Sequence, residues 1–157
     1  MSQDWSIGLS YQSDLADADS RLLEDENDRY SKRVSGVGGY LLWVGKQFEA
    51  TLEIVAATGS FEELDRDRNQ PWAWNAELAH FLPGSNFELA FRVEGSRELE
   101  DGPSYQYGPA ATWRIGKHVS LTLEYLHGEF KDDLATTDSG EPYDQVDHVA
   151  GKFSIEF

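Results

Sequence analysis

The chain has 157 residues, no cysteine and a formal net charge of −16. Its length fits one domain, which we predict to span residues 1–157, and the lack of cysteine excludes a disulfide framework and thiol chemistry. The acidic balance argues against a nucleic-acid partner, because no basic stripe is available to neutralise phosphates.

The sequence contains no apolar run of the roughly 18 residues that a transmembrane helix needs. Residues 1–5 lack the basic and apolar regions of a signal peptide. If the protein is exported, we expect this chain to be a mature form, a fragment or an engineered derivative.

The first predicted strand, residues 4–13, has apolar side chains at every second position. Because successive side chains of a strand point to opposite sides, this alternation predicts one dry and one wet face. We name these the apolar face and the polar face. The apolar face of this strand carries Trp5, Ile7, Leu9 and Tyr11.

The second predicted strand, residues 34–44, has apolar side chains on both faces, so alternation alone does not orient it. An internal repeat offers an orientation, because residues 43–53 align with residues 114–124. If both segments contain the same three-residue turn, Val44 lies opposite Phe48. The residues assigned to the apolar face in this way are Tyr40, Leu42 and Val44, and those assigned to the polar face, as an apolar plug, are Leu41 and Trp43.

Six further strands with the same alternation follow. Their predicted ranges are 47–56, 71–82, 86–94, 104–115, 119–127 and 146–157. Pro109 lies inside the range 104–115 and has no backbone N–H to donate to a ladder. We therefore expect a bulge or a local opening of the sheet at Pro109.

Short and long connections alternate strictly along the chain. The short ones are 45–47, 83–86 and 116–118, and the long ones are 14–32, 57–70, 95–103 and 128–145. All tight turns therefore lie at one end of the strands and all long loops at the other. This layout predicts an all-β fold, an eight-stranded antiparallel up-and-down transmembrane β-barrel in the bacterial outer membrane. The alternative is a soluble lipocalin-like barrel whose apolar face encloses a small apolar ligand.

Aromatic side chains of the apolar face gather near the strand ends, as they do in the girdles that contact membrane interfaces. The predicted girdle residues are Trp5, Phe48, Phe87 and Phe157 near the tight turns, and Tyr11, Trp72, Trp74, Tyr105, Tyr107 and Tyr125 near the long loops. Their positions favour outer-membrane lipid as the partner of the apolar face.

The polar face is predicted to line the lumen with small and charged side chains. The charged ones are Glu49, Glu53, Glu77, Glu88, Arg92, Glu94, Arg114, Glu124, Lys152 and Glu156. We interpret these seven carboxylates and three cations as a network of salt bridges and hydrogen bonds that fills the barrel. The functional alternative is a narrow path for cations or protons.

The long loops carry most of the negative charge. They hold 20 of the 29 acidic residues and seven of the 13 basic residues, which leaves −13 of the net −16 in the loops. We interpret them as a solvated rim. The alternative is a rim that binds divalent cations, alone or together with anionic lipid head groups, although the acidic run 24–28 lacks the pattern of an EF-hand loop.

No catalytic residue, metal site or cofactor is predicted. The four histidines are scattered: His80 and His127 lie on the apolar face, His118 in a turn and His148 on the polar face. Metal sites need several ligands that converge. His127 lies where some outer-membrane lipid hydrolases keep a catalytic histidine, but no serine stands at a spacing that indicates a triad. We therefore predict a protein without enzymatic activity.

Several short motifs resemble LbtU-type siderophore porins, in the order in which that family has them. Residues 5–20 are similar to its strand and loop GLSY…LADSD, residues 70–79 to its strand PSAWNLEL, and residues 152–157 to its ending LAVEF, with 92–108 and 121–127 in between. The resemblance covers nearly the whole chain but only the C-terminal part of the family's longer barrel. It implies siderophore uptake across the outer membrane, and the ending resembles the strand by which the barrel-assembly machinery recognises its substrates.

Eight strands enclose a lumen that side chains just fill, which is too narrow for a siderophore. We therefore expect either a small relative with another role or a piece of a larger barrel. A purely structural or surface-interaction barrel is the third alternative.

Overall fold

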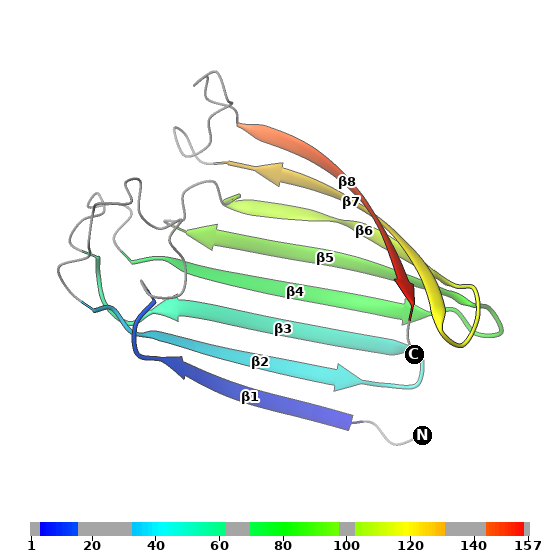
Figure 1. Cartoon of the computed structure of the whole chain (residues 1–157), viewed down its shortest axis with the longest axis horizontal. Coiled ribbons are helices and arrows are strands. Elements are labelled where there is room, and N and C mark those ends of the chain that lie inside the picture. The colour runs from blue at the N-terminus through cyan, green and yellow to red at the C-terminus, as the bar shows by residue number, and fades with distance from the viewer. Residues whose placement is uncertain (1–3, 16–32, 62–69, 98–102, 131–143, 156–157) are drawn as a thin grey trace.

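The computed structural model describes residues 4–15, 33–61, 70–97, 103–130 and 144–155, and every structural statement concerns these ranges. The strands are β1 (Asp4–Gln12), β2 (Gly36–Val44), β3 (Phe48–Ala57), β4 (Trp72–Phe81), β5 (Phe87–Arg97), β6 (Tyr105–Arg114), β7 (Val119–Glu129) and β8 (Gln145–Ile155). They form one antiparallel sheet in sequence order, shown in Figure 1. The predicted all-β, up-and-down arrangement of eight strands is thus confirmed. None of the described residues forms a helix that could cross a membrane.

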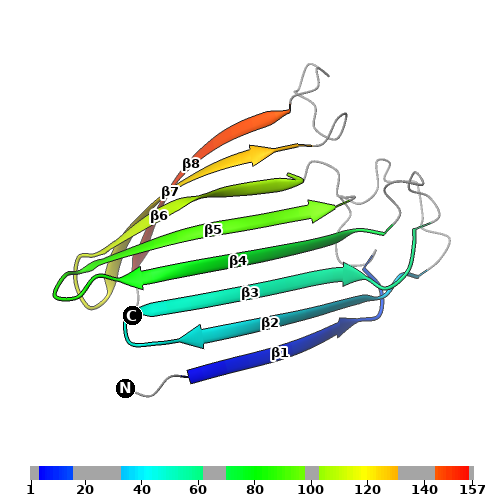
Figure 2. The same cartoon turned by 180° about the vertical axis from the view of Figure 1, so that it is seen from behind.

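The sheet has two edges. β1 pairs with β2 on one side, and β8 pairs with β7 on one side, but β1 and β8 do not pair with each other. The predicted closure into a barrel is therefore not observed. Figures 1 and 2 show that the sheet coils but leaves β1 and β8 at its opposite margins, most clearly at the end of the long connections.

The ladder places the apolar side chains of neighbouring strands on a common face. Residues directly opposite each other point to the same side of a sheet, and Ile54 lies opposite Trp74 and Leu78 opposite Phe91. Of the 24 exposed large hydrophobic residues in the described ranges, 21 lie on this apolar face. The exceptions are Tyr40, Val55 and Val146.

The polar face is the inner side of the coiled sheet. Ala79 and Leu126 on this face are only 3% and 4% exposed, and most of the charged side chains around them are half-buried. On the apolar face, by contrast, Ile7 and Leu9 are 74% and 89% exposed. The sheet therefore turns its apolar face outward, away from the inside of the coil.

The predicted faces of β2 are wrong. Leu41 lies opposite Leu52 and Trp43 opposite Ala50, so both belong to the apolar face and neither forms a plug on the polar face. The residues that were expected on the apolar face and instead lie on the polar face are Tyr40, Leu42 and Val44.

The cause is a difference of one residue between the two repeated hairpins. The Gly45 N–H donates to the Phe48 carbonyl oxygen at 2.8 Å, which leaves a two-residue turn between β2 and β3. In the β6–β7 hairpin the Ile115 N–H donates to the Val119 carbonyl oxygen at 2.9 Å, which leaves a three-residue turn. A shift of one residue moves every side chain of a strand to the other face, so the repeat misassigned β2.

Pro109 interrupts the β6–β7 ladder, as its missing N–H predicts, but the two strands stay in close contact there, because a Cβ added at Gly108 would overlap the Tyr125 carbonyl oxygen. Tyr107 pairs with His127 and Ala110 pairs with Glu124, but Gly108 and Pro109 have no partner in the β6–β7 ladder. The register is the same on both sides of this gap, so no residue is inserted and no bulge forms. The β5–β6 ladder continues past Pro109 without interruption.

A small apolar cluster lies where β1, β2 and β3 reach the long connections. It consists of Val34, Ala57 and Phe61, with Leu15 packed against it, and Phe61 is only 1% exposed. The Leu15 N–H donates to the Val34 carbonyl oxygen at 2.8 Å. These contacts fix the segments that enter and leave β1–β3 at this end of the sheet.

Candidate functional site

The polar face arranges its charged and amide side chains in rows that cross the strands. In one row Glu53 of β3, Asn75 of β4, Glu94 of β5 and Gln106 of β6 lie opposite one another in turn. These rows exist because residues of this chemistry occupy the alternate positions of each strand and the register aligns them. The polar face is therefore the candidate functional surface.

Arg92 is the centre of an ion-pair network on β5–β7. Its Nη2 lies 3.0 Å from Oε1 of Glu124, and its Nε lies 3.4 Å from Oε2 of Glu94. The Arg92 Nε–H has no hydrogen-bond acceptor among the described residues, so its contact with Glu94 is electrostatic. The Gln106 amide donates a hydrogen bond to Oε1 of Glu94, which connects β6 to the network.

A second polar group lies nearer the tight turns. The Arg114 Nη2–H donates to Oε2 of Glu88 at 2.7 Å, and the Arg114 guanidinium lies 5.3 Å from the centre of the Phe81 ring. The hydroxyls of Thr112 and Thr122 are hydrogen-bonded at 2.8 Å. Together with Arg92, these contacts give most carboxylates on β5–β7 a cationic partner.

Carboxylates on β3 and β4 lack such partners. Within the described ranges, no nitrogen of a basic side chain lies within 4.0 Å of a carboxylate oxygen of Glu49, Glu53 or Glu77. The Asn75 side-chain oxygen is also shielded from solvent and has no hydrogen-bond donor among the described residues. On β5–β7 each polar-face carboxylate has a cationic partner, and we call this the charge-balanced half, although three carboxylates share two guanidinium groups. The part on β3–β4 is the acidic half, where Glu77 lies opposite Arg92 in the ladder but forms no ion pair in the described ranges.

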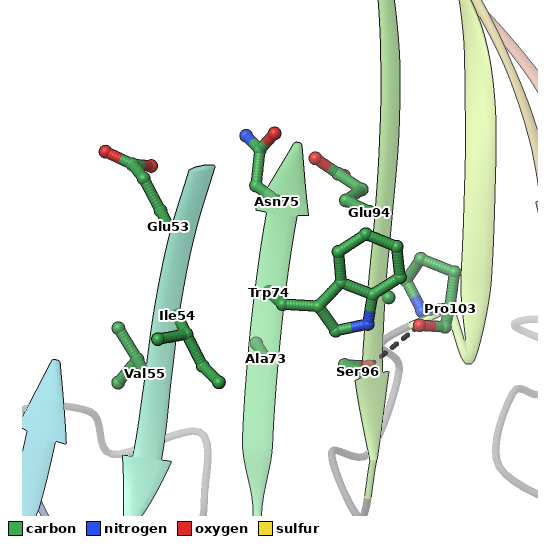
Figure 3. A pocket seen from close by; sticks show the side chains of 10 residues that line it. Glu53, Ile54, Val55, Ala73, Trp74, Asn75, Glu94, Ser96 and Pro103 are labelled. Atoms are coloured by element: carbon green, nitrogen blue, oxygen red, sulfur yellow. Dashed lines mark hydrogen bonds between the residues drawn. The ribbon is translucent and has the colours of Figure 1, made fainter. Parts of the chain in front are cut away.

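A hollow of about 330 Å³ lies at the long-connection end of β3–β5. Figure 3 shows Glu53, Asn75 and Glu94 projecting side by side from three neighbouring strands, while Ser96 donates a 2.7 Å hydrogen bond to the Pro103 carbonyl oxygen. Most of the lining is apolar, with Ile54, Val55 and Trp74 among its residues, and Glu53 and Glu94 are its two charged groups. No group of three or more His, Asp or Glu side chains converges there, or elsewhere in the described ranges, to hold a metal ion.

The structure places nine of the ten predicted lumen residues on the polar face. They are Glu49, Glu53, Glu77, Glu88, Arg92, Glu94, Arg114, Glu124 and Lys152, and Glu156 lies outside the described residues. Ion pairs connect five of the nine. The predicted network is thus present on β5–β7 and does not extend to the acidic half.

Aromatic side chains of the apolar face contact one another near both ends of the strands. Near the tight turns the ring centroids of Trp5 and Trp43 lie 6.1 Å apart, and those of Phe87 and Trp113 lie 6.0 Å apart. The predicted girdle omitted Trp43 because it was assigned to the wrong face. All predicted girdle residues in the described ranges lie on the apolar face, and Phe157 is outside these ranges.

A polar cluster on the apolar face was missed by the sequence analysis. Oδ1 of Asp147 accepts a 2.7 Å hydrogen bond from the Tyr125 hydroxyl and lies 2.8 Å from Nδ1 of His127. The His127 ring also meets Tyr107 edge-on at 5.6 Å. The alternation does place Asp147 on this face, opposite His127, but its partners depend on a register that periodicity does not give. The three polar groups satisfy one another within an aromatic surface.

Comparisons of the chain with protein-family models, with curated proteins and with solved structures found no match. The resemblance to LbtU-type siderophore porins therefore stays a prediction. Most residues of the acidic loops lie outside the described ranges, so a divalent-cation rim also stays a prediction.

Proposed function

We propose that the chain is a non-enzymatic β-barrel protein of the bacterial outer membrane, with its apolar face against lipid and its polar face along a water-filled path for small cations. The observation that carries this proposal is the outward apolar face, which holds 21 exposed large hydrophobic side chains spread over all eight strands. A surface of this kind in contact with water is a strong driving force for association, whereas lipid accepts it at no cost.

The orientation of the faces also favours this proposal over a lipocalin-like barrel. A soluble barrel that binds an apolar ligand turns its apolar side chains inward. Here the inner face carries Glu49, Glu53 and Glu77, and the outer face carries the aliphatic and aromatic residues. The acidic half of the inner face gives the path its preference for cations.

A pair of single substitutions tests the membrane proposal. Leu123 lies in the middle of β7 on the apolar face and is 57% exposed. Leu123→Arg is expected to lower the free energy of unfolding in lipid vesicles by about 2–4 kcal/mol, as a cation does at the bilayer midplane. Its control is Ala150→Arg on the polar face, opposite Glu124, which is expected to be nearly neutral. Urea titration of each variant in vesicles measures both values.

A face in contact with water would give a different result. Leu123→Arg would then leave the stability within about 0.5 kcal/mol, as most exposed substitutions do. The unsubstituted chain would also be monodisperse in plain buffer by size exclusion, which would contradict the proposal. We expect instead that it needs detergent and that the folded and boiled forms migrate differently on a gel.

A further inference from the structure

The two sheet edges are exposed in an unusual way. From Trp5 to Gln12, β1 contains no charged residue and no proline, although natural edge strands are normally protected by such residues, by bulges or by a covering segment. Among the exposed large hydrophobic residues of the described ranges, Leu9 of β1 is the most exposed at 89%, and on β8 Val149 is at 74%. No large hydrophobic residue of the inner strands within the described ranges exceeds the 57% of Leu123. The side chains of β1 and β8 are more exposed because each of these strands has a neighbouring strand on one side only.

The directions and charges of the two edges match each other. β1 and β8 run antiparallel, so pairing them continues the alternation of the sheet and keeps all tight turns at the same end. It also places Asp4 of β1 and Lys152 of β8 on the same, polar face and in the halves of the two strands nearer the tight turns. Pairing β1 with another β1 would instead place the tight turns of the two sheets at opposite ends.

The acidic half of the polar face indicates which β8 is the partner. If β1 paired with β8 of the same chain, eight strands would enclose a lumen that side chains fill. Glu77 lies opposite Arg92, but Glu49 and Glu53 have no basic residue opposite them in the ladders and no ion pair within the described ranges. These two carboxylates would then lose water, and an unpaired buried carboxylate is strongly unfavourable. A barrel of about 16 strands leaves an aqueous channel, in which these carboxylates stay hydrated.

We propose that two copies of this chain close into one barrel, with β1 of each copy paired to β8 of the other. The two-fold axis runs along the barrel, the apolar faces form one continuous outer surface, and each copy supplies half of the lumen. This inference goes beyond the proposed function, because the unpaired edges and the charges of the polar face are present whether or not lipid surrounds the apolar face.

Disulfide cross-linking between differently labelled copies tests the proposal, since the natural chain has no cysteine. One population carries Ser6→Cys or Ser10→Cys in β1, and the other carries Val146→Cys, Ala150→Cys or Ser154→Cys in β8; all five positions lie on the polar face. The populations are folded together, in whichever medium keeps the chain monodisperse, and oxidised gently. We expect a cross-linked heterodimer at twice the chain mass.

The pattern of cross-links reports the strand pairing. In an antiparallel pair, moving the β1 cysteine from Ser6 to Ser10 shifts the best β8 partner four residues toward the start of β8. The control is Ala90→Cys on the polar face of β5, an inner strand, which is expected to give no heterodimer with any β8 variant.

Three outcomes would overturn the proposal. The first concerns a double variant with one cysteine in β1 and one in β8. If it forms a disulfide within a monomer while the mixed single variants form none, the eight strands of one chain close on themselves. The second is a set of β1–β1 homodimers. The third is the absence of a cross-link at all tested registers. Each outcome is independent of whether the chain requires detergent, so it is distinguishable from failure of the membrane proposal.

Discussion

At Gly108 the backbones of two strands approach so closely that no side chain fits. A Cβ added there would overlap the Tyr125 carbonyl oxygen, at the point where Pro109 interrupts the β6–β7 ladder. At Gly116, in the tight turn, an added Cβ would meet no atom within 4 Å. The fold therefore has no room for a side chain at Gly108, whereas it leaves space for one at Gly116.

Gly108→Ala is expected to lower the free energy of unfolding by about 1–3 kcal/mol, as overpacking a close contact does. Backbone atoms of β7 would have to move, because the obstacle is a carbonyl group rather than a flexible side chain. Gly116→Ala is the control and is expected to change stability by less than about 0.5 kcal/mol. Urea titration of both variants under the same conditions measures the difference. Equal stabilities would show that the strands separate at this point at no cost.

Arg92 contacts two carboxylates of the charge-balanced half, and its removal leaves both without a cationic partner in the described ranges. Arg92→Ala is expected to destabilise the fold by about 1–3 kcal/mol, less than the loss of a fully buried partner, because the Arg92 side chain is 25% exposed. Arg114→Ala is the comparison: Arg114 is 57% exposed and forms an ion pair with one carboxylate of the described ranges, Glu88, so we expect a loss of about 1 kcal/mol or less. An unchanged thermal midpoint for Arg92→Ala would contradict a stabilising network.

At the scale of elements, the β2–β3 hairpin shows how one residue in a turn decides on which face of the sheet each side chain of a strand lies. The ladder pairs Leu42 with Thr51, whereas the three-residue turn inferred from the repeat would pair Leu42 with Ala50. Because the pair formed by Gly45 and Phe48 is hydrogen-bonded, the alternation of an antiparallel ladder makes Leu42 and Thr51 a non-hydrogen-bonded pair, the kind with the closer Cα atoms. The two registers are therefore separable by cross-linking.

Leu42→Cys with Thr51→Cys is expected to form a disulfide within the chain upon gentle oxidation. In a non-hydrogen-bonded pair the Cα atoms are about 4.5 Å apart, which lies inside the range that disulfides accept. Leu42→Cys with Ala50→Cys is the matched control and is expected to stay reduced, because these side chains point to opposite faces. Mass spectrometry of the digested chain measures both. A disulfide in the control alone would restore the register inferred from the repeat.

The strands and their connections were predictable because they depend on local order. Alternation with period two identifies a strand whatever its partners are. Pro109 predicts an interrupted ladder because proline has no backbone N–H to donate. The face of β2 was not predictable, because Gly45-Lys46-Gln47 and Gly116-Lys117-His118 look alike but close turns of different length. The division of the polar face into two halves depends on the contacts of Arg92 across three strands. The cluster at Asp147 likewise depends on register.

For the whole molecule, the decisive property is that charge and apolar surface lie on opposite sides of one coiled sheet. The described part of the polar face carries six glutamates and three lysines and arginines. Their excess of negative charge is concentrated on β3 and β4, where Glu49, Glu53 and Glu77 have no ion-pair partner within 4.0 Å in the described ranges. A sheet with this distribution attracts cations along its inner side and repels anions.

Neutralising the acidic half is therefore expected to weaken cation preference without changing the fold. In planar bilayers with a salt gradient, we expect the natural chain to show a reversal potential whose sign indicates cation selectivity. The triple variant Glu49→Gln, Glu53→Gln, Glu77→Gln is expected to shift this potential toward zero. The control is Glu129→Gln, which removes a carboxylate from the exposed apolar face, opposite Tyr105. It is expected to leave the potential unchanged, because a charge outside the lumen does not lie along the path of the ions. The substitutions keep the side-chain shape, and gel migration of the unboiled protein checks that the variants fold. An equal shift in both variants would assign the selectivity to the overall charge of the molecule, and the absence of conductance in the natural chain would favour a structural role for the sheet.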